Sequence, residues 1–337
     1  MALPWPTGSA LPGAILDCNA AVKLTLAGPK VLRWLPAPLV IVLSFVLLLI
    51  ALLISFTLLM LGALVKFLTP SARGRTWLAR YWLGTLVGND CWWGLNRLVY
   101  LLFHGPRRDI VIEGELDPDK TWLLVCNHQS YADIPLLVDI FGRRAPFTRF
   151  FLKQELLWMP VIGLACVALD MPFVKRHSKA AIAANPALRQ QDLEVTRKAC
   201  EKYRSIPVTM VNFLEGTRFT PAKRDAKGSP YRNLLRPKAA GLSFALNAMG
   251  EQFAGIIDVT LCYAPSRYGT LGSYLRGDQR NIHVRARVLP VPMDLVGGDY
   301  QDDPAFRERF QNWVNALWER KDEELTRLKA EDAARVA

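Results

Sequence analysis

Residues 122–136 have the sequence WLLVCNHQSYADIPL, in which an apolar run leads into a polar turn and then into a second apolar segment. The apolar run predicts a buried strand. His128 follows it directly, and Asp133 comes five positions later. Five residues correspond to about 140° around a helix, so the two side chains cannot share one helical face. The stretch therefore predicts a strand, a turn that holds His128, and a helix whose first turn holds Asp133.

From Asp109 onward, short β-rich runs alternate with helical stretches, which is typical of an α/β domain. The predicted strands are 109–113, 121–126, 149–153, 172–175, 207–213, 254–262 and 282–288. The predicted helices are 131–141, 156–169, 185–203, 239–248 and 304–328. The 156–169 run is too short to cross a bilayer and is interpreted as a core helix or a membrane-dipping helix.

The composition narrows the class of protein. The chain has 337 residues, a net charge of +12, 51% hydrophobic residues and a mean hydropathy of +0.13, which excludes disordered, collagen-like and disulfide-scaffold proteins. Its six cysteines are scattered, so we expect no disulfide, no structural zinc and a reducing compartment. The positive charge predicts an anionic partner, which could be nucleic acid, an anionic membrane surface or a phosphorylated small molecule.

The N-terminal part predicts a membrane segment. Residues 34–65 carry no charge, and 39–61 are almost wholly aliphatic, which is long enough to cross a bilayer. No Pro, Gly or Asn lies between Pro38 and Gly62 to form a hairpin turn, so one span is expected. We expect a tail over 1–33 and a transmembrane helix over 34–68.

The rest of the chain divides into three further parts. Residues 69–104 mix Arg and Trp in a way that suits interfacial helices, although a helical hairpin packed on the globular domain is the alternative. We expect one globular domain over 105–300 and a C-terminal helix over 301–337.

His128 and Asp133 form a candidate catalytic pair. A carboxylate that accepts from one ring nitrogen fixes the tautomer and leaves the other nitrogen as a general base. No Ser or Cys is well placed as a nucleophile, so the base would act on a hydroxyl brought by the substrate. A turn histidine with a purely structural role is the alternative. His104 and Asp109 have the same spacing, but no helix start presents that Asp, and we interpret the pair as a decoy.

A second group of polar residues follows the predicted strand 207–213. Glu215, Gly216, Thr217 and Arg218 combine a flexible backbone, a hydroxyl and a guanidinium that can bind a phosphate. The segment 218–238 carries half of the net charge, with basic residues at Arg218, Lys223, Arg224, Lys227, Arg232, Arg236 and Lys238. A solvated basic loop is the alternative to an anion site. Lys175 and Arg176 close another strand and could face the same anion.

Three segments in this order, Asn127–Asp133, Phe173–Arg176 and Phe213–Arg218, resemble the successive motifs of the 1-acylglycerol-3-phosphate (lysophosphatidic acid) acyltransferases. The resemblance covers about 110–263. It implies a mixed central sheet flanked by helices, with an N-terminal transmembrane helix. Lys238 and Gly241 are similar to the basic residue and glycine that commonly follow. Leu214 replaces a frequent proline, and Ile256–Thr260 lacks the proline of the fourth motif. The sequence of residues 214–220, LEGTRFT, is similar to that of the family's lysophospholipid and lysocardiolipin acyltransferases, so the acceptor headgroup stays open.

The resemblance implies roles for these residues. His128 is the general base and Asp133 orients it. Glu215, Gly216, Thr217 and Arg218 hold the acceptor phosphate, with Lys175, Arg176 and Lys238 as further binding residues. The expected reaction moves a fatty acyl group from acyl-CoA or acyl carrier protein to the free hydroxyl of a lysophospholipid. We expect no cofactor and no metal, because a thioester is already activated.

Two other functions are weighed against this one. A thioesterase or transacylase could use Cys126, two residues before His128 on the same strand face, although a strand-end Cys is more often inert. A non-catalytic membrane protein could bind anionic lipid or nucleic acid through its basic surface, but no nucleic-acid-binding module is recognised. Because acyl-CoA and reduced cysteines are cytosolic, we expect a single-pass protein whose catalytic domain faces the cytoplasm, at the inner membrane in a bacterium. The tail would then lie across the membrane.

Overall fold

The computed structural model describes most of the chain. The described residues are 14–16, 21–27, 32, 34–103, 107–174, 185, 187–264, 269–277 and 281–336. Lys175 and Arg176, His104 and Cys18 lie outside them.

A mixed eight-stranded sheet forms the centre of the protein, with strand order β1-β2-β3-β10-β9-β4-β8-β5. Its strands are β1 Ala14–Leu16, β2 Ala21–Ala27, β3 Arg107–Glu113, β4 Thr121–Cys126, β5 Thr148–Phe150, β8 Thr209–Phe213, β9 Phe253–Tyr263 and β10 Ile282–Leu289. The strands β9, β4, β8 and β5 run parallel to one another, whereas β10 is antiparallel to β9 and β2 is antiparallel to β3.

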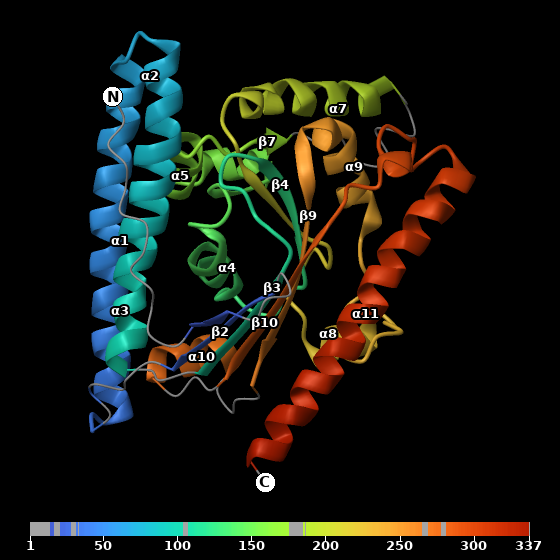
Figure 1. Ribbon diagram of the computed structural model, residues 1–337. Helices are drawn as coiled ribbons and strands as arrows, with labels where there is room; N and C mark the ends of the chain where they lie inside the picture. Colours follow the sequence, from blue (N-terminus) through green and yellow to red (C-terminus); the bar gives the residue numbers. More distant parts are fainter. Residues whose placement is uncertain are drawn as a thin grey trace.

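Helices cover both faces of this sheet (Figure 1). Helix α4 (Asp133–Phe141) packs on one face, where Leu136 and Leu137 join the core around Leu124. Helices α9 (Ala239–Met249) and α11 (Pro304–Val336) cover the other face, where Leu123 is fully buried. Alternate residues of β4 therefore enter two different cores, as expected for a central strand. The predicted fold class, α/β with a mixed central sheet flanked by helices, is confirmed.

The remaining elements surround the sheet. They are β6 Leu152–Lys153 with its parallel partner β7 Phe173–Val174, the helices α5 Ile162–Ala168, α7 Ala187–Cys200, α8 Pro221–Ala226 and α10 Gly269–Arg276, and the short helices η2 Gln154–Trp158, η3 Glu201–Arg204, η4 Gly250–Gln252 and η5 Met293–Leu295. The predicted helix 156–169 is thus two short helices with a turn between them. The predicted strand 149–153 is divided between two sheets.

A helical hairpin lies along one side of the domain (Figure 1). Its first arm is α1 (Ala37–Leu68), and its second arm consists of α2 (Ala72–Trp77), the wide helix η1 (Leu78–Trp93) and α3 (Gly94–Phe103). Buried small residues along α1, including Ser44, Ala51 and Gly62, allow close packing. Residues 72–103 therefore form the second arm of a hairpin packed on the domain, and their interfacial position stays a prediction.

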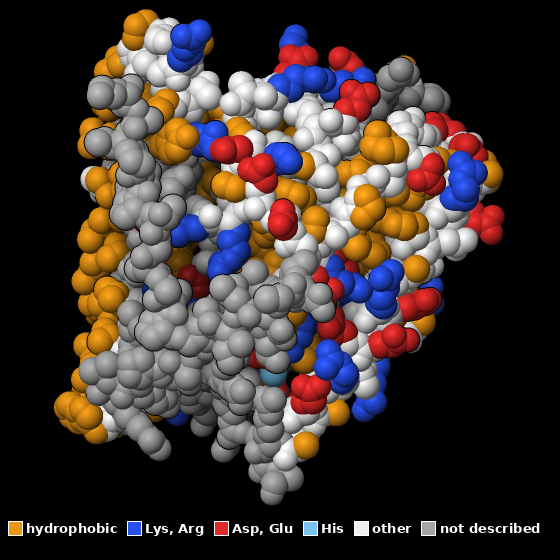
Figure 2. All heavy atoms as spheres, viewed as in Figure 1, with side chains coloured by type: hydrophobic (Ala, Val, Ile, Leu, Met, Phe, Trp, Pro, Cys, Tyr) orange, Lys and Arg blue, Asp and Glu red, His pale blue; other side chains and the backbone are white. Residues whose placement is uncertain are grey.

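The outer face of α1 is apolar. Helix α1 is the one helix among the described residues that is long and apolar enough to cross a membrane, by length and composition. Its exposed side chains include Phe45, Leu53 and Leu64. In Figure 2 this face forms the left edge of the molecule, and hydrophobic side chains predominate along it.

The position of the residues before α1 bears on the predicted single-pass topology. With a single span, the residues before α1 would lie across the membrane from His128. Strand β2 instead pairs with β3 along its whole length, from Ala21 opposite Glu113 to Ala27 opposite Arg107. Strand β2 precedes the hairpin in the sequence and β3 follows it, yet seven residue pairs join them in one sheet. Residues 21–27 therefore lie on the same side as the domain. The hairpin turn follows α1, at Thr69 and Pro70, beyond the apolar stretch that lacks turn residues.

Candidate active site

His128 and Asp133 meet at the carboxyl end of β4. His128 lies in the turn after the strand, and Asp133 is the first residue of α4. His128 Nδ1 is 2.8 Å from Asp133 Oδ2. A carboxylate only accepts, so Nδ1 carries the hydrogen and Nε2 is the basic nitrogen. Nε2 has no hydrogen-bond partner among the described residues, and the side chain is 17% exposed. The histidine is therefore oriented on one side and open to a substrate on the other.

The Asp133 carboxylate is held on both oxygens. Oδ2 also accepts from the backbone N–H groups of Gln129 and Ser130, at 2.7 and 2.9 Å. Oδ1 accepts from the Tyr263 hydroxyl at 2.7 Å. The side chain is fully buried. These donors stabilise a buried negative charge and fix its position beside the imidazole. Sequence reasoning missed Tyr263, whose one signal was its place at the end of a strand.

Two other contacts support the His128 turn. The Asn127 side chain donates to the Leu261 carbonyl at 2.9 Å and accepts from the Leu261 N–H at 2.8 Å, so it continues the β4–β9 pairing beyond the strand. The His128 ring stacks on Phe213, with ring centroids 4.2 Å apart. Both contacts restrict the motion of the imidazole.

Glu215 connects the two predicted motifs. It follows β8, the parallel neighbour of β4, and its oxygens accept from the His128 N–H at 2.8 Å and the Leu235 N–H at 2.9 Å. Burial raises the pKa of Glu215 to about 7, partly offset by these two hydrogen bonds. Glu215 therefore holds the backbone of the His128 turn, and its implied place in the phosphate site stays a prediction.

The turn after Glu215 is tight. Gly216 has φ +63°, in the region that favours glycine, and an added Cβ would lie 2.9 Å from Lys238 Nζ. Lys223 Nζ donates to the Thr217 hydroxyl and the Arg218 carbonyl, each at 3.0 Å. Four of the predicted binding residues, Gly216, Thr217, Arg218 and Lys238, therefore gather at one turn.

Arg218 lies over an aromatic ring. Its guanidinium carbon is 3.5 Å from the ring centroid of Tyr131, which lies in the same loop as His128. A cation–π contact of this kind fixes the plane of the guanidinium. Arg218 is thereby placed beside the catalytic turn rather than in free solvent.

The basic side chains of the segment 218–238 have two different kinds of contact. Arg224 pairs with Asp225, and Arg236 donates to the Gly228 carbonyl at 3.1–3.2 Å. These two side chains stabilise their own loop. Arg218, Lys223 and Lys238 remain at the turn. Lys175 and Arg176 lie outside the described residues, so their predicted role stays a prediction.

Asp109, the carboxylate of the pair interpreted as a decoy, contacts residues away from the His128 turn. It accepts from His283 Nδ1 at 3.1 Å and from Arg285 Nη2 at 2.6 Å. The contacts place Asp109 on the sheet face that α11 covers. The interpretation of His104 and Asp109 as a decoy agrees with this placement.

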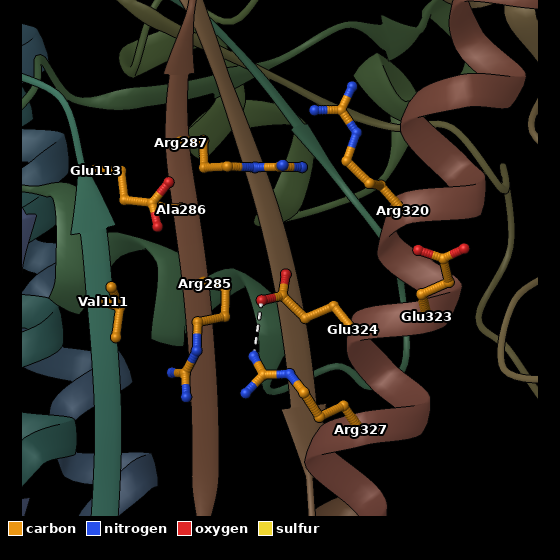
Figure 3. A pocket seen from close by; sticks show the side chains of 9 residues that line it. All are labelled: Val111, Glu113, Arg285, Ala286, Arg287, Arg320, Glu323, Glu324 and Arg327. Atoms are coloured by element: carbon orange, nitrogen blue, oxygen red, sulfur yellow. Dashed lines mark hydrogen bonds and ion pairs between the residues drawn. The ribbon is translucent and has the colours of Figure 1, made fainter.

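A polar groove runs between β10 and α11 on that face (Figure 3). Its lining residues are Val111, Glu113, Arg285, Ala286, Arg287, Arg320, Glu323, Glu324 and Arg327. Arg287 pairs with Asp258 and Arg327 with Glu324, so the groove's positive charge is largely neutralised. It contains none of the predicted site residues.

Cys126 is unsuited to nucleophilic attack. It is fully buried, and its thiol lies 3.8 Å from Asn127 Oδ1. Burial raises the pKa of the thiol well above its ordinary value, so the reactive thiolate is scarce. This environment weighs against the thioesterase alternative.

An apolar cavity of about 420 Å³ begins beside the catalytic turn. Tyr131, Ala132 and Pro135 form one wall of it. The other walls come from the helical hairpin and α10, through Phe45, Leu48, Leu49, Leu52, Trp92, Trp93, Asn96, Leu271 and Tyr274. A space with so little polar lining suits a hydrocarbon chain.

The acyltransferase family model matches residues 109–264. This stretch of the chain is similar to an acyltransferase domain. The match agrees with the stretch that the sequence motifs delimit, and the resemblance is confirmed. The matched stretch contains His128, Asp133 and the Glu215–Arg218 turn.

The domain is similar to known glycerolipid enzymes. Human 1-acyl-sn-glycerol-3-phosphate acyltransferase gamma is 25% identical over 50% of this chain and 43% of its own length. The mouse epsilon form is 24% identical over 63% of this chain and 60% of its own length. The chain thus matches only about half of the length of these relatives. The crystal structure of the acyltransferase PlsC from Thermotoga maritima aligns with 84% of this chain and 97% of its own, at 20% identity and a TM-score of 0.45.

Proposed function

We propose that the protein transfers a fatty acyl group from acyl-CoA or acyl carrier protein to the free hydroxyl of a lysophospholipid such as 1-acylglycerol-3-phosphate. The observation that carries the proposal is the His128–Asp133 pair, with Nδ1 bound at 2.8 Å and Nε2 unpartnered among the described side chains. Its place within an acyltransferase-family domain supports acyl transfer. No cofactor is needed, because the thioester supplies an activated carbonyl.

The proposed mechanism uses His128 as a general base. Nε2 removes the proton of the acceptor hydroxyl as its oxygen attacks the thioester carbonyl carbon. The tetrahedral intermediate collapses, the carbon–sulfur bond breaks, and the imidazolium returns the proton to the leaving thiolate. Asp133 stabilises the imidazolium and keeps the ring in one tautomer. A buried carboxylate that accepts from four donors is suited to this role because its position is fixed.

Arg218 is the proposed ligand of the acceptor phosphate. Its guanidinium stacks on Tyr131, three residues from His128, so a phosphate bound there would bring the neighbouring hydroxyl toward Nε2. Lys223 and Lys238 add positive charge at the same turn. Holding two amphiphiles in this geometry would supply much of the rate through effective molarity.

The apolar cavity is the proposed site of an acyl chain. It borders the catalytic turn through Tyr131 and Ala132 and reaches α1 through Leu48 and Leu52. A chain placed there would lie between the domain and the hairpin. Contact of the exposed apolar face of α1 with the membrane would then let lipids enter from the bilayer. We further propose that the domain lies on the cytoplasmic side, where acyl-CoA is available.

The test is an assay with purified protein in detergent. Oleoyl-CoA is offered with lysophosphatidic acid, lysophosphatidylglycerol, lysophosphatidylethanolamine or lysocardiolipin, and the acylated form of each acceptor is measured. Product with at least one acceptor, abolished in His128→Ala, supports the proposal. Fatty acid release without any acylated acceptor would identify a thioesterase instead. Lipid binding without turnover in any arm, with acyl carrier protein also tried as the donor, would identify a non-catalytic lipid-binding protein.

A further inference from the structure

An apolar run without any charge lies between Glu155 and Asp170. It forms η2, a turn and α5, yet most of its large side chains are outside the core. The exposed members are Leu157, Trp158, Met159, Val161, Ile162, Leu164 and Val167, with Trp158 82% exposed and Leu164 60% exposed. We call these seven residues the 157–167 surface. Contiguous exposed apolar surfaces of this kind mark sites that contact another apolar phase.

The backbone of this surface is held in a strained form. Val161 has φ +66°, a backbone conformation that is rare for a β-branched residue. Hydrogen bonds from Ile162 N to the Pro160 carbonyl and from Gly163 N to the Met159 carbonyl fix the turn, at 2.7 and 2.8 Å. A Cβ at Gly163 would lie 2.2 Å from the Leu157 carbonyl oxygen. The fold therefore maintains an ordered turn that presents apolar side chains to the outside.

The surface is attached to α1. Ala165, Ala168 and Leu169 pack with Leu59 of α1 in one hydrophobic cluster. Lys66, near the end of α1, pairs with Asp170 at 2.5 Å and neutralises the charge that ends the run. The two elements are thereby fixed side by side.

We propose that the 157–167 surface is a second lipid-contacting element, which inserts into the bilayer leaflet that contacts the outer face of α1. The partner is a membrane rather than a protein because the surface adjoins α1, whose outer face is itself exposed and apolar. An exposed Trp among aliphatic residues also suits a bilayer interface. The inference rests on the proposed contact of α1 with lipid.

The function of a second contact is to set orientation. A single helix could rotate about its own axis at the membrane. Two apolar elements in rigid contact, α1 and the 157–167 surface, leave one orientation in which both are covered by lipid. The catalytic turn would then be held at a constant depth.

The first experiment measures lipid contact directly. A Trp158→Cys variant, with the native cysteines replaced by Ala, is labelled with a nitrobenzoxadiazole probe and reconstituted in phosphatidylcholine–phosphatidylglycerol vesicles. The control carries the probe at Glu194→Cys on α7, an exposed position remote from α1. We expect the probe's emission to shift to shorter wavelength, and to be quenched by doxyl-labelled acyl chains, at position 158 only. Quenching by aqueous iodide at position 158, equal to that at position 194, would overturn the proposal.

The second experiment compares presentations of the acceptor. Trp158→Glu/Leu164→Glu should lower kcat/KM by about tenfold or more with vesicle-borne lysophospholipid, since two apolar anchors are lost, and should leave the rate in detergent micelles unchanged. Val195→Glu, which places a charge at an exposed apolar position on α7, is the matched control. Equal rates for the double variant and the control on vesicles would contradict the inference. Co-flotation of the wild-type protein with vesicles tests the proposed lipid contact of α1 separately. Concentration-dependent self-association through position 158 would identify a protein partner instead.

Discussion

The Tyr263 hydroxyl donates to Asp133 Oδ1 at 2.7 Å, across 130 positions of sequence. This bond joins the end of β9 to the first residue of α4. Because His128 follows β4, three elements, β4, β9 and α4, meet at one carboxylate. The imidazole of His128 occupies the other oxygen. The basicity of Nε2 therefore depends on a residue that does not itself contact the histidine.

Tyr263→Phe tests this dependence. Loss of the donor leaves a buried carboxylate oxygen unsatisfied, which should lower the free energy of unfolding by about 1–3 kcal/mol. The less stabilised charge of Asp133 should favour the imidazolium, so the acid limb of the pH profile of kcat/KM should move to higher pH. Tyr203→Phe is the control, because its hydroxyl donates to the Asp170 carbonyl instead. An unchanged pH profile would remove Tyr263 from the positioning of His128.

His128→Ala and Asp133→Asn should each lower acyl transfer by about 100-fold or more, because they remove a general base and its orienting partner. His104→Ala should have little effect. Product formation is measured with saturating acyl donor, and thermal unfolding checks that the variants are folded. Equal losses at the two histidines would invalidate the assignment of the catalytic pair.

Arg218→Lys should raise the KM for the lysophospholipid by about tenfold, because a point charge does not reproduce a planar fork stacked on Tyr131. The KM for acyl-CoA should change much less. Arg236→Lys is the matched control, since Arg236 donates to a loop carbonyl. If instead the acyl-CoA KM rises, Arg218 binds the phosphates of the donor.

Stability should depend on pH through His283. This fully buried side chain lies between Asp109 and Asp332, with Nδ1 and Nε2 at 3.1 and 3.0 Å from the carboxylates. The hydrogen bond to Asp109 raises the pKa of His283 above its ordinary value of 6.5, against the effect of burial. A raised pKa in the folded state means that the stabilisation is complete below about pH 6.5 and is lost as the pH rises through the folded value.

Urea unfolding between pH 6 and 9 measures this loss. His283→Gln should be less stable than the wild type at pH 6, and the difference should shrink toward pH 9. Glu215 also has a raised pKa, but it titrates in both proteins and cancels from the comparison. A difference that stays constant with pH would show that His283 is neutral in the folded protein.

The position of β2 predicts the topology. Two single-cysteine variants are compared: one keeps only Cys18, and the other carries only Glu194→Cys. An impermeant maleimide should label both from the same side of the membrane. Cys18 follows β1 in the chain and precedes β2, which pairs with β3 of the domain. Labelling of the two cysteines from opposite sides would restore the single-pass arrangement.

Local patterns predicted several elements closely. Helix α9 and strands β4, β9 and β10 begin and end within one residue of the predicted bounds, because buried strands and helices carry continuous apolar runs. The predicted helix 156–169 was less accurate, since Val161 turns the chain in a conformation that its side chain disfavours. Pro160 and Gly163, two residue types that interrupt helices, lie at that turn and were not weighted enough against the apolar run.

The sequence by itself determined the parts that depend on neighbouring residues. These are the α/β class, the apolar helix α1, and the His128–Asp133 pair, whose spacing places a turn histidine beside a helix start. Only the tertiary structure decided that Tyr263 holds Asp133, that Glu215 anchors the His128 turn, and that β2 joins the sheet beside β3. Each of these relations joins residues that are distant in the chain, and its geometry is set by strand order and packing. A local pattern of residue types carries no record of which strands become neighbours.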